Sequence, residues 1–148
     1  MQSSSDGYQI VWLIRRLFRA MAQKSNDSLQ GLGITVADRA VLEFLYPDEE
    51  LSVPEIAKRY QVSRQHVQVT VNGLLKSGLL ATKSNPRHKR SSLITLANGG
   101  RALFGKIKIQ DTEIVEQLFS RVPEKDQLIT RRTLKTLLAQ LIKEINDV

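Results

Sequence analysis

The stretch that decides the fold is residues 52–78, SVPEIAKRYQVSRQHVQVTVNGLLKSG. At its start, Ser52 and Glu55 stand three residues apart, the spacing of a helix capping box, and Pro54 is tolerated in a first helical turn. This start signal predicts a short helix that ends near Tyr60.

A second helix follows almost at once. Ser63 is suited to cap its start, and Gly78 is suited to end it, because glycine readily adopts the left-handed backbone found after helices. The two helices are therefore expected to be joined by a very short turn. Apolar residues recur in the second helix at helical spacing and define its buried face: Val67, Val71, Leu74 and Leu75.

Beyond Leu79 the apolar period changes. The pattern predicts strands over Leu80–Ser84 and Ser91–Leu96, joined by a hairpin whose basic tip reads NPRHKR at 85–90. Helix, turn, helix and basic hairpin is the order of a winged helix-turn-helix. The expected fold class is thus mainly α with a small β wing.

Helices are also expected before this segment. Tyr8–Gln30 carries apolar residues at helical spacing, which predicts an amphipathic first helix. Thr35, followed by Asp38 three residues later, resembles a capping box for a second helix that continues through Leu45.

Two further helices are expected after the hairpin. Asn98-Gly-Gly should interrupt the chain before the first of them, and Pro123 separates it from the last. The last helix bears a continuous apolar stripe that exceeds the needs of one small core. Its members are Leu134, Leu137, Leu138, Leu141, Ile142 and Ile145.

The length of 148 residues suits a single domain, 1–148. Within it we assign 35–97 to a winged helix-turn-helix DNA-binding lobe. The flanking segments, 7–31 and 99–147, are assigned to dimerisation helices, because both carry apolar faces that the lobe does not need.

The net charge of +7 is concentrated in one part of the chain. Residues 52–90 hold eight Lys and Arg against a single acid, Glu55, whereas the basic and acidic residues elsewhere cancel. Surface charges that serve solubility are usually mixed in sign, so a segregated block favours a polyanionic partner over a merely solvated face.

The composition argues against an enzyme. Without cysteine there can be no disulfide, thiolate metal site or cysteine nucleophile. The two histidines, His66 and His88, lie in the basic segment without acidic neighbours, and no phosphate-binding Gly-rich loop is present. We expect no catalysis, cofactor or metal. Because no stretch has the length of a membrane span and no secretory signal is recognisable, we expect a cytoplasmic protein.

These features resemble the MarR family of bacterial transcriptional regulators, named after the multiple antibiotic resistance repressor, over nearly the whole chain. The resemblance rests on LSVPEIA at 51–57, VSRQ at 62–65, LLKSGL at 74–79, and NPRHKR at 85–90 leading to LITL at 93–96. It implies a homodimeric regulator of transcription.

Two positions depart from the family pattern. The family usually has Asp where this chain has Asn85, two residues before the arginine retained here as Arg87, so the acid of the usual wing-tip ion pair is missing. A Thr commonly follows the last wing leucine as a helix cap. Here that residue is Ala97, and Asn98 is the candidate to cap instead.

A helical wheel places one face of the second helix opposite its buried residues. Gln65, Val69, Asn72 and Lys76 lie there, with His66 beside them, and this face is expected to enter the major groove of DNA. Amides can bond adenine bidentately, and a small apolar side chain can contact the thymine methyl. Ser63, Arg64 and Gln68 complete the expected contacts, Arg64 and Gln68 toward phosphate.

The hairpin supplies a second set of expected contacts. The resemblance implies that one tip arginine enters the minor groove, where narrow A·T-rich DNA concentrates negative potential, and we choose Arg87. The other wing residues, Lys83, His88, Lys89 and Arg90, are expected to line the backbone, where the lysines and Arg90 would neutralise phosphates without reading sequence.

The last helix and the first would together leave a large apolar patch on a monomer. We therefore expect a two-fold homodimer that presents two recognition helices about 34 Å apart to a pseudo-palindromic operator. The alternative is that these apolar residues close a monomeric core.

The resemblance further implies repression that is relieved by a small aromatic or anionic effector bound near the dimer helices. Candidate pocket residues on the first helix are Tyr8, Trp12, Arg16 and Arg19, which could stack on and pair with such a ligand. The competing interpretation assigns these aromatic residues to the core.

A different class of function stays open beside the regulator. A winged-helix adaptor or RNA-binding module would lack an operator, and its expected mark is a neutralised wing and recognition face. This chain has the opposite charge pattern. The operator, the regulated genes, the effector and the choice between repressor and activator cannot be inferred from the sequence.

Overall fold

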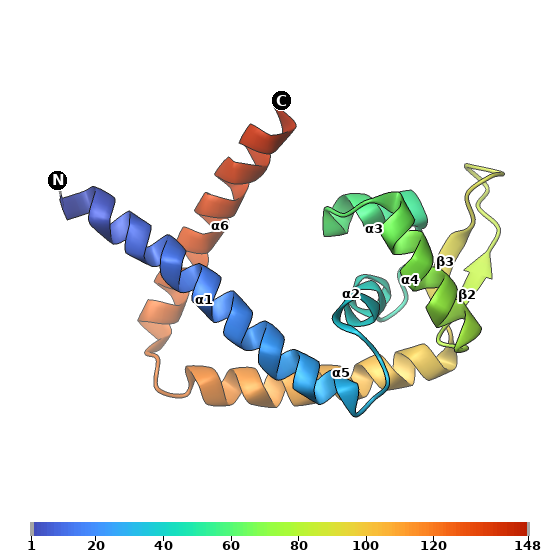
Figure 1. The fold of residues 1–148 in the computed structure, drawn as a ribbon, viewed down its shortest axis with the longest axis horizontal. Coiled ribbons are helices and arrows are strands. Elements are labelled where there is room, and N and C mark those ends of the chain that lie inside the picture. The colour runs from blue at the N-terminus through green and yellow to red at the C-terminus, as the bar shows by residue number, and fades with distance from the viewer. Residues whose placement is uncertain (1, 148) are drawn as a thin grey trace. The chain divides into compact units, whose positions relative to one another are not determined.

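The computed structural model describes residues 2–147. Residues 1 and 148, which the expected domain includes, lie outside the described part. The chain forms two compact units, Met1–Gly105 and Lys106–Val148. The elements, drawn in Figure 1, are α1 (Gln2–Gln30), α2 (Val36–Leu45), β1 (Leu51–Ser52), α3 (Val53–Tyr60), α4 (Arg64–Lys76), β2 (Leu80–Lys83), β3 (Leu93–Leu96), α5 (Asn98–Phe119) and α6 (Glu124–Asn146).

Two capping boxes begin the helices of the first unit as the sequence predicts. At α2, the Asp38 N–H donates to the Thr35 hydroxyl at 3.1 Å, and the Thr35 N–H donates to the Asp38 carboxylate at 2.9 Å. At α3, Ser52 and Glu55 exchange the same pair of bonds, at 2.7 and 3.4 Å. Each box satisfies two backbone N–H groups that the helix start would otherwise leave unpaired.

The C-terminus of α4 is a Schellman motif. Gly78 has a φ of 76°, which confirms the expected left-handed glycine after the helix. Its N–H donates to the Leu75 carbonyl at 3.1 Å, and the Leu79 N–H donates to the Leu74 carbonyl at 3.0 Å. The chain therefore turns directly from α4 into β2.

The wing belongs to a three-stranded antiparallel sheet with the order β1-β3-β2. Leu93 of β3 pairs with Ser52 on one side and with Lys83 on the other. The two expected strands are confirmed, each slightly shorter than predicted. Strand β1 was not expected, because two residues cannot show a period; Leu51 is buried there beside the hairpin.

Two helix starts differ from the prediction. Helix α1 begins at Gln2 rather than Tyr8, since backbone hydrogen bonding continues through polar residues that show no apolar period. Helix α5 begins at Asn98, so Asn98-Gly-Gly does not interrupt the chain. Asn98 is thus the first residue of the helix and not the residue before it, and its side-chain oxygen accepts from Arg101 Nη1 at 3.3 Å.

The reason for glycine at position 100 is a close backbone approach. A Cβ at Gly100 would overlap the carbonyl oxygen of Leu79. The glycine therefore brings the first turn of α5 against the end of α4, and it serves packing, not a chain break.

The first unit has one apolar core, and the α4 residues Val67, Val71 and Leu74 are buried in it as predicted, whereas Leu75 is partly buried. Among the aromatic residues, Tyr46 packs against Phe104 with ring centroids 5.0 Å apart. The remaining core comes from the end of α1, the segment after it, α2, α3, the sheet and α5: Leu29, Ile34, Val41, Leu42, Leu45, Leu51, Ile56, Ala57, Leu80, Ile94, Leu96 and Phe104.

Of the described residues of the second unit, only Ile107 is buried. None of the described residues of α6 is buried, and its apolar stripe is exposed in the isolated chain except at the half-buried Ile142. Within residues 2–147, no helix has the length and apolar content needed to cross a membrane.

Candidate nucleic-acid interface

The exposed face of α4 is the one that the helical wheel predicts. Gln65, Val69, Asn72 and Lys76 are all exposed, and so is His66. Val69 is 68% exposed although its neighbours at 67 and 71 are buried. An exposed apolar side chain among amides has no solvation advantage, so this face is suited to contact a partner.

Two of the amides on α4 are held together. Gln68 Nε2 donates to Asn72 Oδ1 at 2.8 Å, one helical turn apart. This bond occupies one acceptor position of the Asn72 oxygen, so the Asn72 amide keeps a second acceptor position and two N–H donors for another partner. The start of the helix is fixed by Ser63, whose hydroxyl accepts from the His66 N–H at 3.1 Å. These two bonds hold Gln68 against Asn72 and fix the first turn of α4.

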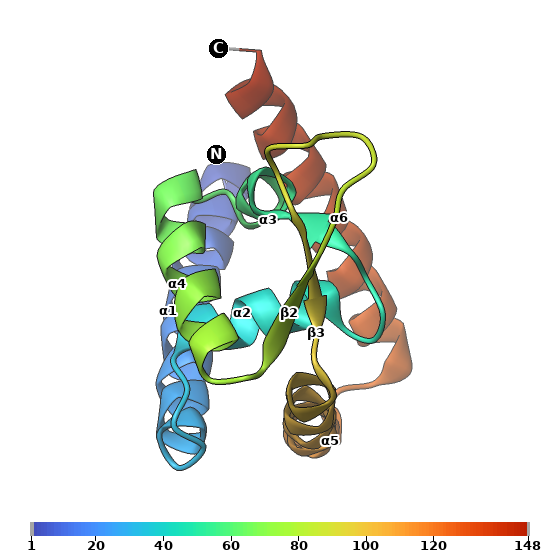
Figure 2. The same cartoon turned by 90° about the vertical axis from the view of Figure 1, so that its right-hand side faces the viewer.

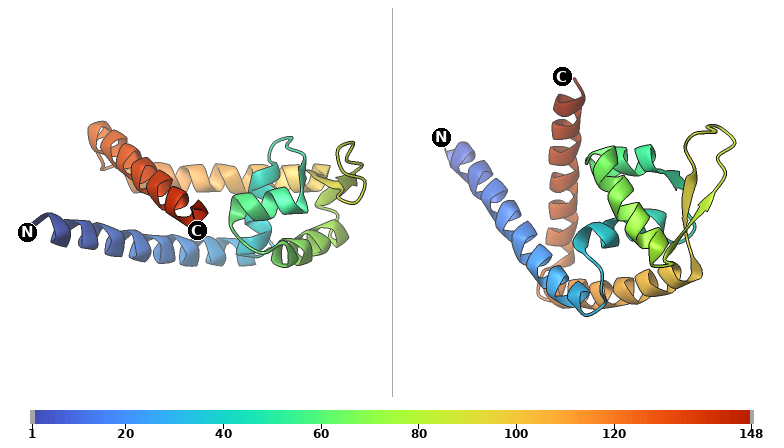
Figure 3. Two further views of the ribbon diagram at one scale, coloured as in Figure 1. Left: turned by 90° about the horizontal axis from the view of Figure 1, so that it is seen from above. Right: turned by 45° about the vertical axis from the view of Figure 1, so that its right-hand side comes forward.

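The tip of the hairpin is ordered by Asn85. Its Oδ1 accepts from the Arg87 N–H at 3.0 Å, which is the hydrogen bond of an Asx turn. A neutral amide thus sets the backbone where the family usually has a carboxylate. Arg87, Lys89 and Arg90 are exposed beyond this turn, and so is His88. Figure 3 shows the loop between β2 and β3 extending past the strands.

Lys83 differs from the other wing cations because it is already paired. Its Nζ lies 2.7 Å from Glu50 Oε1, on the loop between α2 and β1. Both side chains are substantially exposed, at 59% and 41%. Glu50 occupies one of the three donors of the Lys83 ammonium, and this partner 33 residues away was missed by sequence reasoning.

The single acid of the basic segment serves the helix start and is not free for catalysis. The Ser52 backbone N–H and then the Ser52 hydroxyl bond the Glu55 carboxylate, and together they lower the pKa of Glu55. Arg59 and Arg87 lower this pKa further through their charges. The Glu55 carboxylate therefore stays ionised to a lower pH than an ordinary glutamate.

Helix α4 lies next to β2, so the recognition face and the wing belong to the same unit (Figure 2). Six of the eight basic residues of segment 52–90 lie on α4 and the hairpin, and the other two, Lys58 and Arg59, lie on α3. Among residues 2–147, no cluster of three or more His, Cys, Asp or Glu could hold a metal ion.

The four candidate effector residues lie on α1 and are exposed, which disagrees with their assignment to a core of the isolated chain. Tyr8 is 72% exposed. The Arg16 guanidinium lies 4.6 Å from the centroid of the Trp12 ring, a cation–π contact, and Arg19 follows on the same helix.

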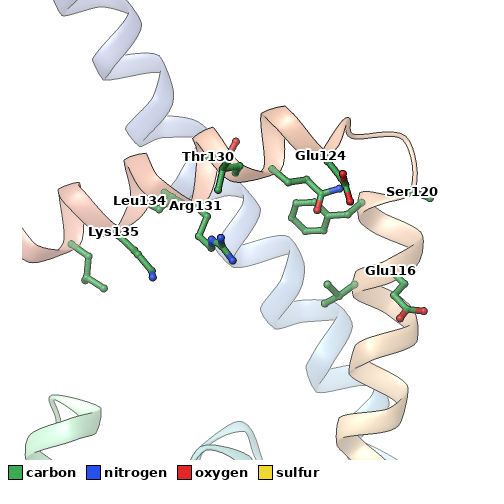
Figure 4. A pocket seen from close by; sticks show the side chains of 12 residues that line it. Glu116, Ser120, Glu124, Thr130, Arg131, Leu134 and Lys135 are labelled. Atoms are coloured by element: carbon green, nitrogen blue, oxygen red, sulfur yellow. The ribbon is translucent and has the colours of Figure 1, made fainter.

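A separate open groove of about 920 Å³ lies in the second unit, between the end of α5 and α6. Its apolar wall includes Val115, Phe119 and Leu134. Figure 4 shows Glu116, Ser120, Glu124, Arg131 and Lys135 around it.

Helix, short turn, exposed helix and basic hairpin define a winged helix-turn-helix protein. The MarR family model matches residues 32–91, which contain α2, α3, α4 and most of the hairpin. The helix-turn-helix part of the chain is therefore similar to the MarR family.

Relatives in bacteria span most of the chain. An uncharacterized protein of Mycobacterium tuberculosis is 29% identical over 140 residues, which cover 95% of this chain and 92% of the relative. The HTH-type transcriptional repressor MdtR of Bacillus subtilis is 25% identical over 115 residues, or 78% of this chain and 74% of that protein.

Solved structures share the fold. A MarR family transcription regulator, SP03579, superposes with a TM-score of 0.82 at 23% identity, covering 99% of this chain and 96% of the other. MepR of S. aureus in complex with DNA gives 0.78 at 23% identity, over 88% and 96% of the two chains.

Proposed function

We propose that this protein is a transcriptional regulator that binds duplex DNA sequence-specifically as a homodimer. The observation that carries the proposal is the segregation of charge: the whole net charge of +7 falls in segment 52–90, which forms α3, the exposed helix α4 and the wing. The MepR structure, which contains DNA, has the same fold and supports this use of the surface.

In this proposal α4 reads bases in the major groove. Gln65 and Asn72 offer amides, the groups that pair with adenine N6 and N7, and Val69 offers methyls to thymine. Lys76 and His66 flank them on the same exposed face. The face therefore suits A·T-containing half-sites, and Ser63, Arg64 and Gln68 lie toward its edges where phosphate would run.

The wing would bind the adjacent minor groove and backbone. Arg87, whose backbone is set by Asn85, is our candidate for insertion into a narrow A·T-rich minor groove. Lys89 and Arg90 would neutralise phosphates, and His88 lies between them. Lys83, at the root of the wing, is held by Glu50 instead.

A second copy of the chain is the proposed cover for the apolar faces. On α1, Leu13, Leu17 and Phe18 are each at least half exposed, which is unusual for a soluble monomer. On α6, considered by itself, Leu138, Leu141 and others are likewise exposed. Two-fold pairing of these helices would place two α4 faces on one operator.

We further propose that a small aromatic or anionic effector relieves repression. Arg16 over the Trp12 ring offers a cation beside an aromatic face, and Tyr8 and Arg19 lie on the same helix. A structural neighbour, BpsR of Bordetella bronchiseptica, has its DNA binding regulated by 6-hydroxynicotinic acid; it shares the fold at 22% identity and a TM-score of 0.73. MdtR is named a repressor, which favours repression here.

The testing experiment measures binding of the purified chain to duplex DNA from upstream of its own gene. A scrambled duplex and a duplex RNA of equal length serve as competitors. Selective binding that weakens steeply with salt supports the proposal. Equal, weak binding to both DNA duplexes, or preference for RNA, would instead favour an adaptor or RNA-binding module.

A further inference from the structure

The loop between α2 and β1 is fixed by side chains from two distant parts of the chain. From α5, Arg101 Nε donates to the Pro47 carbonyl at 3.1 Å, and Nη2 pairs with Asp48 Oδ1 at 3.1 Å. From the root of the wing, Lys83 Nζ pairs with Glu50 Oε1 at 2.7 Å. Every one of these groups belongs to the first unit.

The Lys83–Glu50 ion pair crosses the whole sheet. Lys83 is the last residue of β2, and its strand partner Leu93 is paired on its other side with Ser52 of β1. Glu50 directly precedes β1. The ion pair therefore spans the central strand β3 and ties one edge strand to the loop before the other, at the point where the wing leaves the sheet.

We propose that Glu50 is a positioning residue for the wing. Held on a loop anchored by Arg101, it fixes Lys83 and with it the root of the hairpin, so that the Asn85 turn presents Arg87 in one orientation. Lys83 thereby acts through Glu50 rather than as a phosphate contact. This inference rests on the proposed binding of DNA.

Removal of Glu50 has an effect on binding whose sign depends on its role. Glu50 is an acid beside a basic surface, so electrostatics alone would make its removal strengthen binding to a polyanion. If Glu50 positions the wing, its removal frees a flexible lysine and the hairpin root, and binding weakens despite the gain in positive charge. The two roles therefore predict opposite changes in affinity.

The test compares Glu50→Gln with Glu49→Gln in the same duplex-binding assay. Both substitutions remove one acid from the same exposed loop, and within the described residues no ion pair of Glu49 occurs. We expect Glu50→Gln to weaken operator binding about threefold to tenfold for the two wings of a dimer, because exposed ion pairs are individually weak. Glu49→Gln should leave binding unchanged or strengthen it slightly. Stronger binding by both variants would overturn the proposal.

A charge exchange separates positioning from direct contact. Lys83→Glu alone should weaken binding, and adding Glu50→Lys restores the ion pair in reverse at the wild-type net charge. Recovery of most of the affinity supports positioning, whereas affinity that stays as low as in the single variant means that Lys83 itself contacts DNA.

Two further readouts complete the design. Arg101→Gln should also weaken binding, and combined with Glu50→Gln the losses should be less than additive, since both residues hold one loop. Thermal unfolding of Glu50→Gln should stay within a few degrees of wild type, because the pair is exposed. A wild-type protein that binds no duplex refutes the proposed function, whereas binding with the wrong sign for Glu50→Gln refutes the positioning role alone.

Discussion

Replacing Arg90 by glutamine tests whether the wing neutralises phosphate. Arg90 is exposed near the tip of the hairpin, and a dimer on an operator carries two copies. Each phosphate contact on duplex DNA contributes about 0.9 to the slope of log affinity against log salt, so Arg90→Gln should make that slope shallower by about 1.8. Between roughly 50 and 200 mM salt, the wild type should lose roughly tenfold more affinity than the variant.

The assay is fluorescence anisotropy of a labelled operator duplex at several salt concentrations. Arg121→Gln, in the turn between α5 and α6, removes the same charge outside the wing and serves as control. An equal change of slope in the control would show that net charge, not a wing contact, is responsible. A loss of affinity in Arg90→Gln that is the same at every salt concentration would refute the phosphate contact.

Three further predictions concern the lobe itself. Asn85→Ala should lose the Asx turn and weaken operator binding about threefold to tenfold. Asn85→Asp keeps the acceptor of that turn, so its affinity should differ from wild type mainly at low salt. Binding titrations at several salt concentrations would measure both effects. Gly100→Ala should destabilise the fold by about 1–3 kcal/mol in urea unfolding, because the added methyl would overlap the Leu79 carbonyl. Gly99→Ala is the control: its methyl would make only ordinary contacts, and the free energy of unfolding should stay near that of the wild type. Glu55→Gln should lower the free energy of unfolding at neutral pH. Because the pKa of Glu55 in the folded protein is lowered from its ordinary value of 4.5, this difference between variant and wild type should vanish as the pH falls through the folded pKa. A difference that does not change with pH would contradict the ionised capping box.

The predictable part of the fold is the part that neighbouring residues decide. Capping boxes at Ser52 and Thr35 and the glycine at 78 act over a few neighbouring residues, so their spacing carries the information. The buried and exposed faces of α4 likewise follow from helical period. The winged helix-turn-helix order therefore follows from local sequence patterns alone.

Long-range contacts could not be inferred in this way. The Lys83–Glu50 pair joins residues 33 apart, and the Arg101–Asp48 pair joins residues 53 apart, with nothing in either segment to indicate its partner. The same limit explains the error at Asn98-Gly-Gly. Glycines are interpreted as chain breakers when only the local backbone is considered, whereas Gly100 is required by a carbonyl on another element.

The proposed dimer would enlarge the small DNA-reading surface of one copy. A single α4 offers two amides and Val69 to bases, and each good bidentate pair discriminates by about 1–3 kcal/mol. Two such amides give about 2–6 kcal/mol, whereas regulators distinguish their sites from other DNA by roughly 4–10 kcal/mol, so one face reaches only the lower part of that range. Two copies double the base contacts and the phosphate contacts together. In the proposed dimer the exposed apolar residues of α1 and α6 would serve the same function as the basic wing, and a protein that remained monomeric at micromolar concentration on its operator would contradict that proposal.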